Sequence, residues 1–233
     1  MRPLRAIIFD MDDTLYPEES YVLSGFRALA QWAQQKLGIE AERGYGELEA
    51  LFRQGVRGDT FDRWLVSHGR APQEWVPQMV QVYRQHQPMI EPYPGVPDLL
   101  ARLRGCYLLG LISDGYLEVQ RAKFQALGLA AWFSVVVFAD KGGRAAWKPS
   151  VWPYRRALAQ LGCEPQGAVY VGDNPLKDFK GAREVGMSTI WLRRSAGVYA
   201  DRLPPSPEYA PHATVHDLAE LEALIEHWGE ERL

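Results

Sequence analysis

Two aspartates spaced i, i+2 follow the first apolar run of the chain, and a threonine stands two residues further on: Asp10, Asp12 and Thr14. Three further polar groups each follow a later apolar run. They are Ser113-Asp114-Gly115, Lys148-Pro149 and Gly172-Asp173-Asn174-Pro175-Leu176-Lys177-Asp178. An acid pair, a hydroxyl, a lysine and a second acid pair are the groups that a magnesium-dependent phosphoryl-transfer site uses. Their joint presence in this order makes such a site the leading interpretation.

The first acid pair offers a nucleophile and a proton-transfer group. A carboxylate is a competent nucleophile toward phosphorus, so Asp10 would form an aspartyl-phosphate. Asp12 would donate a proton to the leaving group and then take one from the attacking water. Side chains at i and i+2 of a strand end point to the same side, which brings both carboxylates to one site. The hydroxyl of Thr14 is a further candidate for binding phosphate.

The remaining polar groups would hold the metal and the phosphoryl group. Asp10, the backbone carbonyl of Asp12 and the carboxylate of Asp173 offer the oxygen ligands that Mg²⁺ prefers. Asp178 would hold metal-bound water or orient the lysine from behind. The lysine, Lys148, is a point charge that balances the phosphoryl group and the nucleophile together.

The second polar group would supply hydrogen-bond donors to the phosphoryl oxygens. Ser113 offers a hydroxyl, and the backbone N–H groups of Asp114 and Gly115 add to it.

The elements that must position these groups alternate between strand and helix from about residue 93 onward. Continuous apolar runs predict strands at 4–9, 106–112, 134–138, 168–171 and 188–192, with a short edge strand at 214–215. Helices are expected at 116–127, 150–161 (capped by Ser150) and 176–185, and a closing helix after Asp217. This alternation predicts an α/β fold: a Rossmann-like parallel sheet with helices on both faces. In such a sheet, ligands bind beyond the carboxyl ends of the strands, where all four polar groups lie.

Residues 17–91 break the alternation and contain no strand pattern. Val22, Phe26, Leu29, Ala33 and Leu37 fall at helical spacing, and further helices are expected near 46–54, 60–68 and 74–86. We therefore predict an inserted all-helical domain at 17–91, between the two parts of the sheet domain at 1–16 and 92–233. The proline-rich stretch 91–95 is interpreted as a rigid return to the sheet domain.

Composition narrows the class of protein. The chain has 233 residues, 47% of them hydrophobic, and is expected to be globular. A net charge of −3 argues against a nucleic-acid partner. No run of about 18 apolar residues is present, so no membrane span is expected, and no signal peptide is recognised. Cys106 and Cys163 lack metal-ligand spacing. Cys106 is expected in the core, both thiols reduced, and the protein cytoplasmic.

These motifs resemble those of the haloacid dehalogenase (HAD) superfamily of hydrolases. The matching residues, in the order of the family's four motifs, are Asp10-Met11-Asp12-Asp13-Thr14, Ser113, Lys148, and Gly172-Asp173 with Asp178. The resemblance implies a Rossmann-like core with a helical cap inserted after the first motif. It also implies Asp10 as nucleophile, Asp12 as acid and base, and Mg²⁺ held by Asp10, the Asp12 backbone and Asp173. Asp114 stands where the family often has asparagine, so it should point away from phosphate or pair with a cation such as Lys177.

An aspartate at the position of Asp12 distinguishes the reaction types found within the superfamily. True dehalogenases and phosphonate hydrolases lack this aspartate, so a phosphatase or phosphomutase is favoured, and a phosphatase first. A cap of this size suits small soluble phosphates, so the expected partner is a small phosphorylated metabolite such as a sugar phosphate or nucleoside monophosphate. Candidate cap contacts to the substrate are Arg53 and Arg57, with Asp59 and Arg63 nearby.

Three alternatives stay open. A phosphomutase of the same fold would return the phosphoryl group to a sugar rather than to water. A signalling receiver domain also gathers acids, a hydroxyl and a lysine at strand ends, but receivers are shorter and lack the helical insert. A non-catalytic protein that binds phosphate ligands could use the same scaffold. The sequence predicts no oligomeric state and does not separate Mg²⁺ from Mn²⁺.

Overall fold

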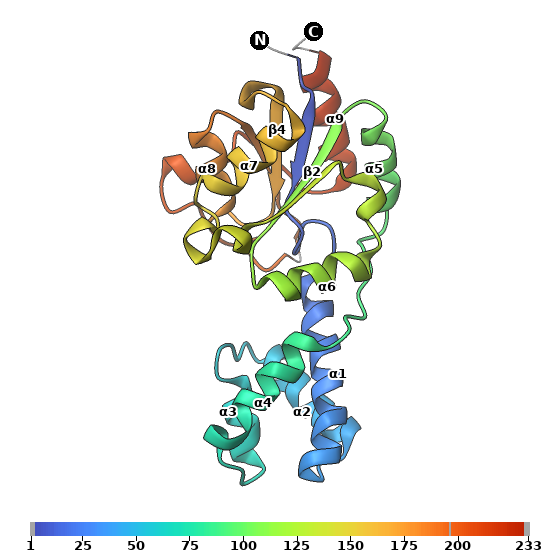
Figure 1. The fold of residues 1–233 in the computed structure, drawn as a ribbon, viewed down its shortest axis with the longest axis vertical. Coiled ribbons are helices and arrows are strands. Elements are labelled where there is room, and N and C mark those ends of the chain that lie inside the picture. Colours follow the sequence, from blue (N-terminus) through green and yellow to red (C-terminus); the bar gives the residue numbers. More distant parts are fainter. Residues whose placement is uncertain (1–2, 196, 231–233) are drawn as a thin grey trace. The chain divides into compact units, whose positions relative to one another are not determined.

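The computed structural model describes residues 3–195 and 197–230, and the chain divides into two compact units (Figure 1). The core unit comprises Met1–Pro17 and Glu91–Leu233, and the helical unit comprises Glu18–Ile90. Each unit is described by itself below.

The core unit is built on a six-stranded parallel sheet. Its strands are β1 (Ala6–Phe9), β2 (Leu108–Ser113), β3 (Val135–Phe138), β4 (Ala168–Gly172), β5 (Ser188–Leu192) and β6 (Ala213–Val215), in the order β3-β2-β1-β4-β5-β6. All six strands were predicted, with β1 and β2 each beginning two residues later than expected. The chain runs outward from β1 through β2 to β3 and then from β4 to β6, so the order reverses between β1 and β4. Ligands bind at such a reversal, beyond the carboxyl ends of the strands.

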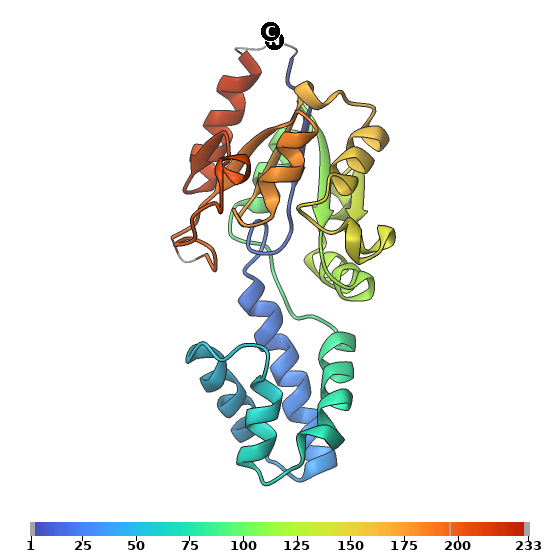
Figure 2. The same cartoon turned by 90° about the vertical axis from the view of Figure 1, so that its left-hand side faces the viewer.

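Helices cover both faces of the sheet, which confirms the predicted fold class. On one face, α7 (Trp152–Leu161) and α8 (Asp178–Glu184) pack on the strands, and their buried side chains form one apolar cluster with Ile8, Tyr170 and Trp191. The other face carries α5 (Val96–Arg104) and α9 (Leu218–Glu230). In Figure 2 the red helix α9 and the yellow helix α7 lie on opposite sides of the sheet. Within the described residues, no helix combines the length and apolar character that crossing a bilayer requires.

The helical unit contains α1 (Glu18–Leu37), α2 (Ala41–Arg53), α3 (Thr60–Ser67) and α4 (Pro72–Gln85). Its residues, all of which the structure describes, form no strand. Phe26, Leu29 and Ala33 of α1 pack with Leu48, Trp64 and Met79 in an apolar core of its own. The i, i+3, i+4 spacing on α1 thus became the buried face of that helix, as predicted.

Helix α5 and the position of Cys106 differ from the sequence prediction. Helix α5 was not predicted; its apolar positions Val96, Leu99, Leu100 and Leu103 are buried at helical spacing directly after the proline-rich return. Because α5 ends at Arg104 with Gly105 as its C-cap, Cys106 lies in the connection before β2 and is exposed, so its predicted placement in the core was wrong.

Two helices begin later than predicted. Helix α7 starts at Trp152, although Ser150 Oγ still accepts a hydrogen bond from the Trp152 N–H at 3.3 Å. Helix α8 starts at Asp178 because Asn174 holds a turn before it: its carbonyl accepts from the Asp178 N–H at 3.0 Å, and its side chain accepts from the Leu176 N–H at 2.9 Å. Asn is a usual turn and cap residue for this reason.

Helix α8 approaches the loop that carries Lys148 at a glycine. A Cβ atom on Gly181 would lie 2.4 Å from the carbonyl oxygen of Pro149 and 2.7 Å from Cε2 of Tyr154. We therefore expect Gly181→Ala to lower the free energy of unfolding by about 1–3 kcal/mol, the usual cost of overpacking. Urea unfolding measures the loss. The control is Gly46→Ala on α2, where an added Cβ meets nothing within 4 Å. Equal stability of Gly181→Ala and the wild type would contradict this account.

Candidate active site

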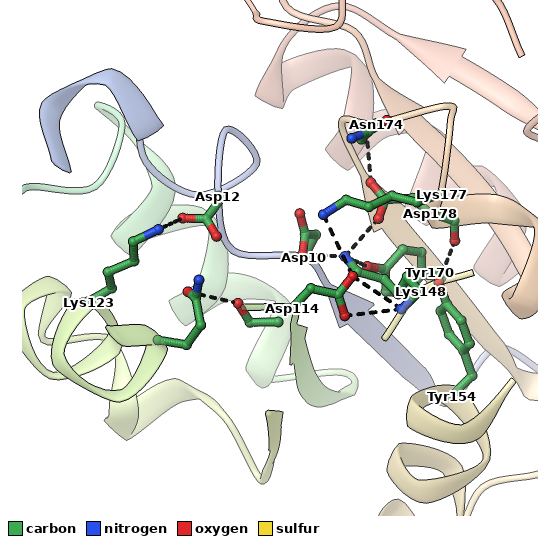
Figure 3. A network of polar contacts seen from close by, with 12 residues as sticks. Asp10, Asp12, Asp114, Lys123, Lys148, Tyr154, Tyr170, Asn174, Lys177 and Asp178 are labelled. Carbon is green, nitrogen blue, oxygen red and sulfur yellow. Dashed lines mark hydrogen bonds and ion pairs between the residues drawn. The ribbon is translucent and has the colours of Figure 1, made fainter. Parts of the chain in front are cut away.

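The strand register brings the predicted site residues to one edge of the sheet. Phe9, the last residue of β1, pairs with Leu111 of β2 and with Val171 of β4. Asp10, the next residue, donates its N–H to the Val171 carbonyl at 2.8 Å. The carboxyl ends of three neighbouring strands therefore meet around Asp10, as Figure 3 shows.

A fully buried lysine joins two of the predicted acids. Lys148 Nζ lies 2.6 Å from Asp10 Oδ1 and 2.7 Å from Asp178 Oδ1, and it donates a third hydrogen bond to the Tyr170 hydroxyl at 3.0 Å (Figure 3). The other oxygen of Asp178 accepts from the Asn174 N–H at 2.8 Å. Both oxygens of Asp178 are thus already bonded within the protein, and of the two roles expected for it the geometry matches orientation of Lys148.

Burial and mutual repulsion shift the protonation of this cluster. Burial raises the pKa of Asp10 from 3.8 to about 6, although Lys148 acts in the opposite direction. Burial likewise raises the pKa of Asp173 well above its ordinary value, and Asp178 and Asp10 raise it further. Burial acts to lower the pKa of Lys148, but Asp10 and Asp178 outweigh it and raise that pKa well above normal. The lysine is therefore firmly cationic, while burial and the neighbouring acids disfavour the ionised forms of Asp10 and Asp173.

The donor set of this cluster fits a divalent cation. Carboxylate oxygens of Asp10, Asp173 and Asp178 all lie within 4.8 Å of one another, and all three residues are buried. Asp173 Oδ2 is buried without a hydrogen-bond partner among the described residues. The four carboxylates of Asp10, Asp114, Asp173 and Asp178 face two ammonium groups, those of Lys148 and Lys177, which leaves an excess of two negative charges when all are ionised. A dication with oxygen ligands supplies that balance.

Asp12 lies apart from the Lys148 cluster and has its own cation. Its Oδ1 atom accepts a hydrogen bond from Lys123 Nζ at 2.7 Å and a second, very short one from the Tyr16 hydroxyl. Burial acts to raise the pKa of Asp12, but the Lys123 charge and these two hydrogen bonds outweigh it and lower that pKa below its ordinary value. The backbone carbonyl of Asp12, an expected metal ligand, accepts from the Thr14 N–H at 2.6 Å. A carbonyl oxygen has a second lone pair, so this bond leaves room for a further partner.

The Ser113-Asp114-Gly115 motif also lies at this edge of the sheet. Ser113 ends β2, and its buried hydroxyl donates to Gln120 Oε1 at 3.1 Å. Asp114 accepts from the backbone N–H of Lys148 at 3.2 Å, and its Oδ2 lies 3.7 Å from Lys177 Nζ. The predicted pairing of Asp114 with Lys177 is thus present. Gly115 has φ +124°, and a Cβ there would lie 2.3 Å from Gln120 Nε2. Only glycine fits this backbone conformation so close to the Gln120 side chain.

Three predicted phosphate-binding residues have other surroundings. The Thr14 hydroxyl is fully buried and has no hydrogen-bond partner among the described residues. Arg53, in the helical unit, pairs with Glu19 at 2.6 Å and Glu49 at 3.4 Å. Arg57 donates to the carbonyl oxygens of Phe52 and Val56, and its guanidinium lies 3.8 Å from the Phe52 ring centroid. The local partners of both arginines are residues of the helical unit itself.

The contact residues in this network that were not predicted as site residues include Gln120, Lys123, Tyr154 and Tyr170. Gln120 and Lys123 lie on a helix that follows the Ser113 loop directly, but only the structure shows that both are buried. A lysine is almost never fully buried unless it is paired. The tyrosines lie inside apolar patterns on α7 and β4, where only the structure shows their hydroxyls to be bonded to Asp178 O and Lys148.

Replacing Asp173 tests whether the carboxylates of the cluster outnumber its positive charges. Asp173→Asn should raise the free energy of unfolding in EDTA by roughly 1–3 kcal/mol, because a carboxyl whose pKa is raised in the folded state destabilises it at neutral pH. The same variant should lose the Mg²⁺-dependent rise in Tm that we expect of the wild type. Thermal unfolding with Mg²⁺ and with EDTA measures both. Asp201→Asn, at an exposed position, is the control. An unchanged Mg²⁺ shift in Asp173→Asn would contradict the assignment.

Comparison with known proteins places this site in a family. A family model described as "Haloacid dehalogenase-like hydrolase" matches residues 7–192. The chain is 32% identical to the glyceraldehyde 3-phosphate phosphatase of Methanopyrus kandleri, over 89% of this chain and 91% of that protein. It is 28% identical to the phosphoserine phosphatase of Thermus thermophilus, over 94% of this chain and 98% of that protein.

A solved structure agrees with these matches. The crystal structure of 2-haloacid dehalogenase from Pseudomonas syringae pv. tomato DC3000 superposes with a TM-score of 0.64 at 25% identity, covering 97% of this chain and 99% of that one. The motif resemblance, the fold and the similarity over most of the chain agree. The chain belongs to the haloacid dehalogenase-like hydrolases.

Proposed function

We propose that this hydrolase is a Mg²⁺-dependent phosphatase that acts on a small soluble phosphomonoester through an aspartyl-phosphate at Asp10. One observation carries the proposal. A carboxylate at the end of the central strand β1 lies 2.6 Å from a buried lysine and beside two further buried aspartates, while a second carboxylate follows two residues later. This arrangement provides a nucleophile, charge balance for a phosphoryl group and a separate proton-transfer group.

The relatives and Asp12 support phosphoryl chemistry over dehalogenation. The two curated relatives described above are named as phosphatases of a sugar phosphate and an amino acid phosphate. The dehalogenase structure shares the fold, but the dehalogenases lack the second aspartate of the pair, which this chain has at Asp12. We therefore place the chain's substrates among phosphomonoesters of similar size.

In the first half of the proposed reaction, the Asp10 carboxylate attacks phosphorus and the bond between phosphorus and the leaving oxygen breaks. Lys148, held by Asp10 and Asp178, keeps a positive charge beside the transferring group. Ser113 exchanges its hydrogen bond to Gln120 for one to a phosphoryl oxygen. The pKa of Asp12 lies below its ordinary value in the free protein, and the negative charge of the bound phosphate acts to raise it. In its protonated form, Asp12 gives its proton to the leaving oxygen, so the alcohol departs neutral.

In the second half, water attacks phosphorus of the phospho-Asp10 and Asp12 takes the proton from that water. The Asp10 carboxylate is regenerated and inorganic phosphate is released. Mg²⁺, held by Asp10, Asp173 and the Asp12 backbone carbonyl, would supply positive charge that allows the anionic nucleophile and the anionic phosphate to approach. We propose that the helical unit acts as a cap that excludes water and reads the leaving group, with Arg53 and Arg57 as candidate contacts.

The experiment is phosphate release from a panel of sugar phosphates, nucleoside monophosphates and phospho-amino acids, with Mg²⁺ and with EDTA. The proposal predicts release that requires Mg²⁺ and differs among the panel members. Folded protein that releases no phosphate from any member would overturn it. A product in which the phosphoryl group has moved within a sugar phosphate, without free phosphate, would instead identify a phosphomutase.

A further inference from the structure

Lys123 is a buried lysine outside the motif residues. It lies on α6 (Leu117–Leu127), is 2% exposed, and its Nζ is 2.7 Å from Asp12 Oδ1. Figure 3 shows its side chain extending from α6 toward Asp12. An ammonium group removed from water is costly unless an opposite charge accompanies it, so this pair is a specific arrangement rather than a solvated surface contact.

Two hydrogen-bond donors meet at one carboxylate oxygen of Asp12. Lys123 Nζ and the Tyr16 hydroxyl both donate a hydrogen bond to Oδ1. Tyr16 reaches Asp12 because the loop turns back on itself: Asp13 has φ 51°, and Asp12 and Tyr16 form a bridge of backbone hydrogen bonds. Lys123 Nζ also lies 5.9 Å from the centroid of the Tyr16 ring. Two donors that converge on one oxygen restrict the rotation of the carboxyl group.

The same helix serves a second site residue. Gln120, one turn before Lys123, accepts the hydrogen bond from the Ser113 hydroxyl. Residues at i and i+3 lie on one face of a helix, so one face of α6 holds Ser113 and Asp12 together. Both helix residues are at least nine-tenths buried. The helix therefore connects the phosphate-binding hydroxyl and the proton-transfer carboxyl.

We propose that Lys123 is a positioning residue for proton transfer: it holds Asp12 by Oδ1 so that Oδ2 faces the leaving oxygen. The inference rests on the proposed phosphatase function. In the step concerned, the proton moves from Asp12 Oδ2 to the leaving oxygen. At the same time the bond from that oxygen to phosphorus breaks and the bond from Asp10 to phosphorus forms. Lys123 keeps its protons throughout and acts only through Asp12.

Leaving groups of different basicity separate this role from a purely structural one. The parameter kcat/KM reports only the steps up to transfer of the phosphoryl group to Asp10. In those steps an alkyl leaving group needs a proton, whereas p-nitrophenolate departs without one. If Lys123 only held α6 in place, its loss would lower kcat/KM for both kinds of substrate by the same factor.

The test compares Lys123→Met with the wild type on an alkyl phosphate from the panel and on p-nitrophenyl phosphate. We expect kcat/KM to fall about 10- to 100-fold for the alkyl phosphate, a part of what general acid catalysis contributes, and less than about 3-fold for p-nitrophenyl phosphate. Lys123→Arg, which keeps the charge, should recover part of the loss. Arg121→Met, at an exposed position of the same helix, is the control and should change neither value.

A double-mutant cycle tests the coupling to Asp12. In an Asp12→Asn background, Lys123→Met should change kcat/KM for the alkyl phosphate by less than about 2-fold, since no acid remains to be positioned. Equal losses on both substrates, or an undiminished loss in that background, would overturn the inference while leaving the phosphatase function intact. A wild type that releases phosphate from neither substrate would overturn the proposed function and this inference with it.

Discussion

Replacing Asp10 with asparagine is expected to lower kcat/KM for phosphomonoesters by about 10⁴-fold or more, since a residue that forms the covalent intermediate has no substitute. The amide has the shape of the carboxyl but is not a nucleophile. Its oxygen can still accept the hydrogen bond from Lys148 Nζ, which lies 2.6 Å from Asp10 Oδ1 in the wild type. We therefore expect the variant to stay folded, and far-ultraviolet circular dichroism with steady-state kinetics measures both effects.

In EDTA, the same variant is expected to be more stable than the wild type, and the difference in the free energy of unfolding should grow with pH. The pKa of Asp10 is 3.8 in the unfolded chain and about 6 in the folded protein, so between these values the folded state binds more protons. In EDTA, the free energy of unfolding of the wild type should thus fall relative to that of Asp10→Asn as pH rises from about 4 to about 6. Asp98→Asn, an exposed aspartate, controls for the change in net charge. Full turnover by Asp10→Asn would exclude the aspartyl-phosphate mechanism.

Replacing Lys148 with methionine is expected to damage both stability and turnover. Its Nζ is wholly buried and lies within 2.7 Å of carboxylates from Asp10 and Asp178. Removing one partner of a buried ion pair usually costs about 3–5 kcal/mol, because the remaining charge is left without compensation. The loss of positive charge at the transferring group should lower kcat/KM by about 10³-fold. Urea unfolding and steady-state kinetics measure the two losses separately.

A second substitution separates these two effects of Lys148. Adding Asp178→Asn to Lys148→Met removes one of the stranded carboxylates, so part of the stability should return while turnover stays low. Lys141→Met, an exposed lysine after β3, is the control. A Lys148→Met variant that keeps kcat/KM within about 10-fold of the wild type would contradict a role at the reacting group.

The sequence predicted the sheet well because its strands are continuous apolar runs that end at polar residues. Ser188–Leu192 was predicted to the residue, since a β-branched apolar segment follows a glycine turn. Helix α5 was missed because its signal, four apolar positions over two turns, stands directly behind a proline-rich stretch that was interpreted as a connection alone. The wrong prediction that Cys106 is buried has the same cause, because the connection after an unpredicted helix was taken as the start of a strand.

The candidate site was predictable where a residue belongs to a motif, and not where it acts through a partner. Asp10, Lys148 and Asp173 directly follow strands or stand in a fixed order, and the fold brings them together. Lys123 is distant from Asp12 in sequence, and no spacing rule connects a helix residue to a loop that far away. Its pairing depends on how β2 and α6 lie beside β1, which is tertiary information.

The most direct test of the central claim is to trap the phosphoryl group on the protein. Asp12→Asn should be mixed with excess p-nitrophenyl phosphate and Mg²⁺ and quenched in acid, because this leaving group departs without a proton while the later attack of water lacks its base. We predict a burst of p-nitrophenol equal to the enzyme concentration and one phosphoryl group on the peptide that contains Asp10. The Asp10→Asn, Asp12→Asn double variant should show neither. A burst with the phosphoryl group on another residue, or turnover with none on the protein, would contradict the account.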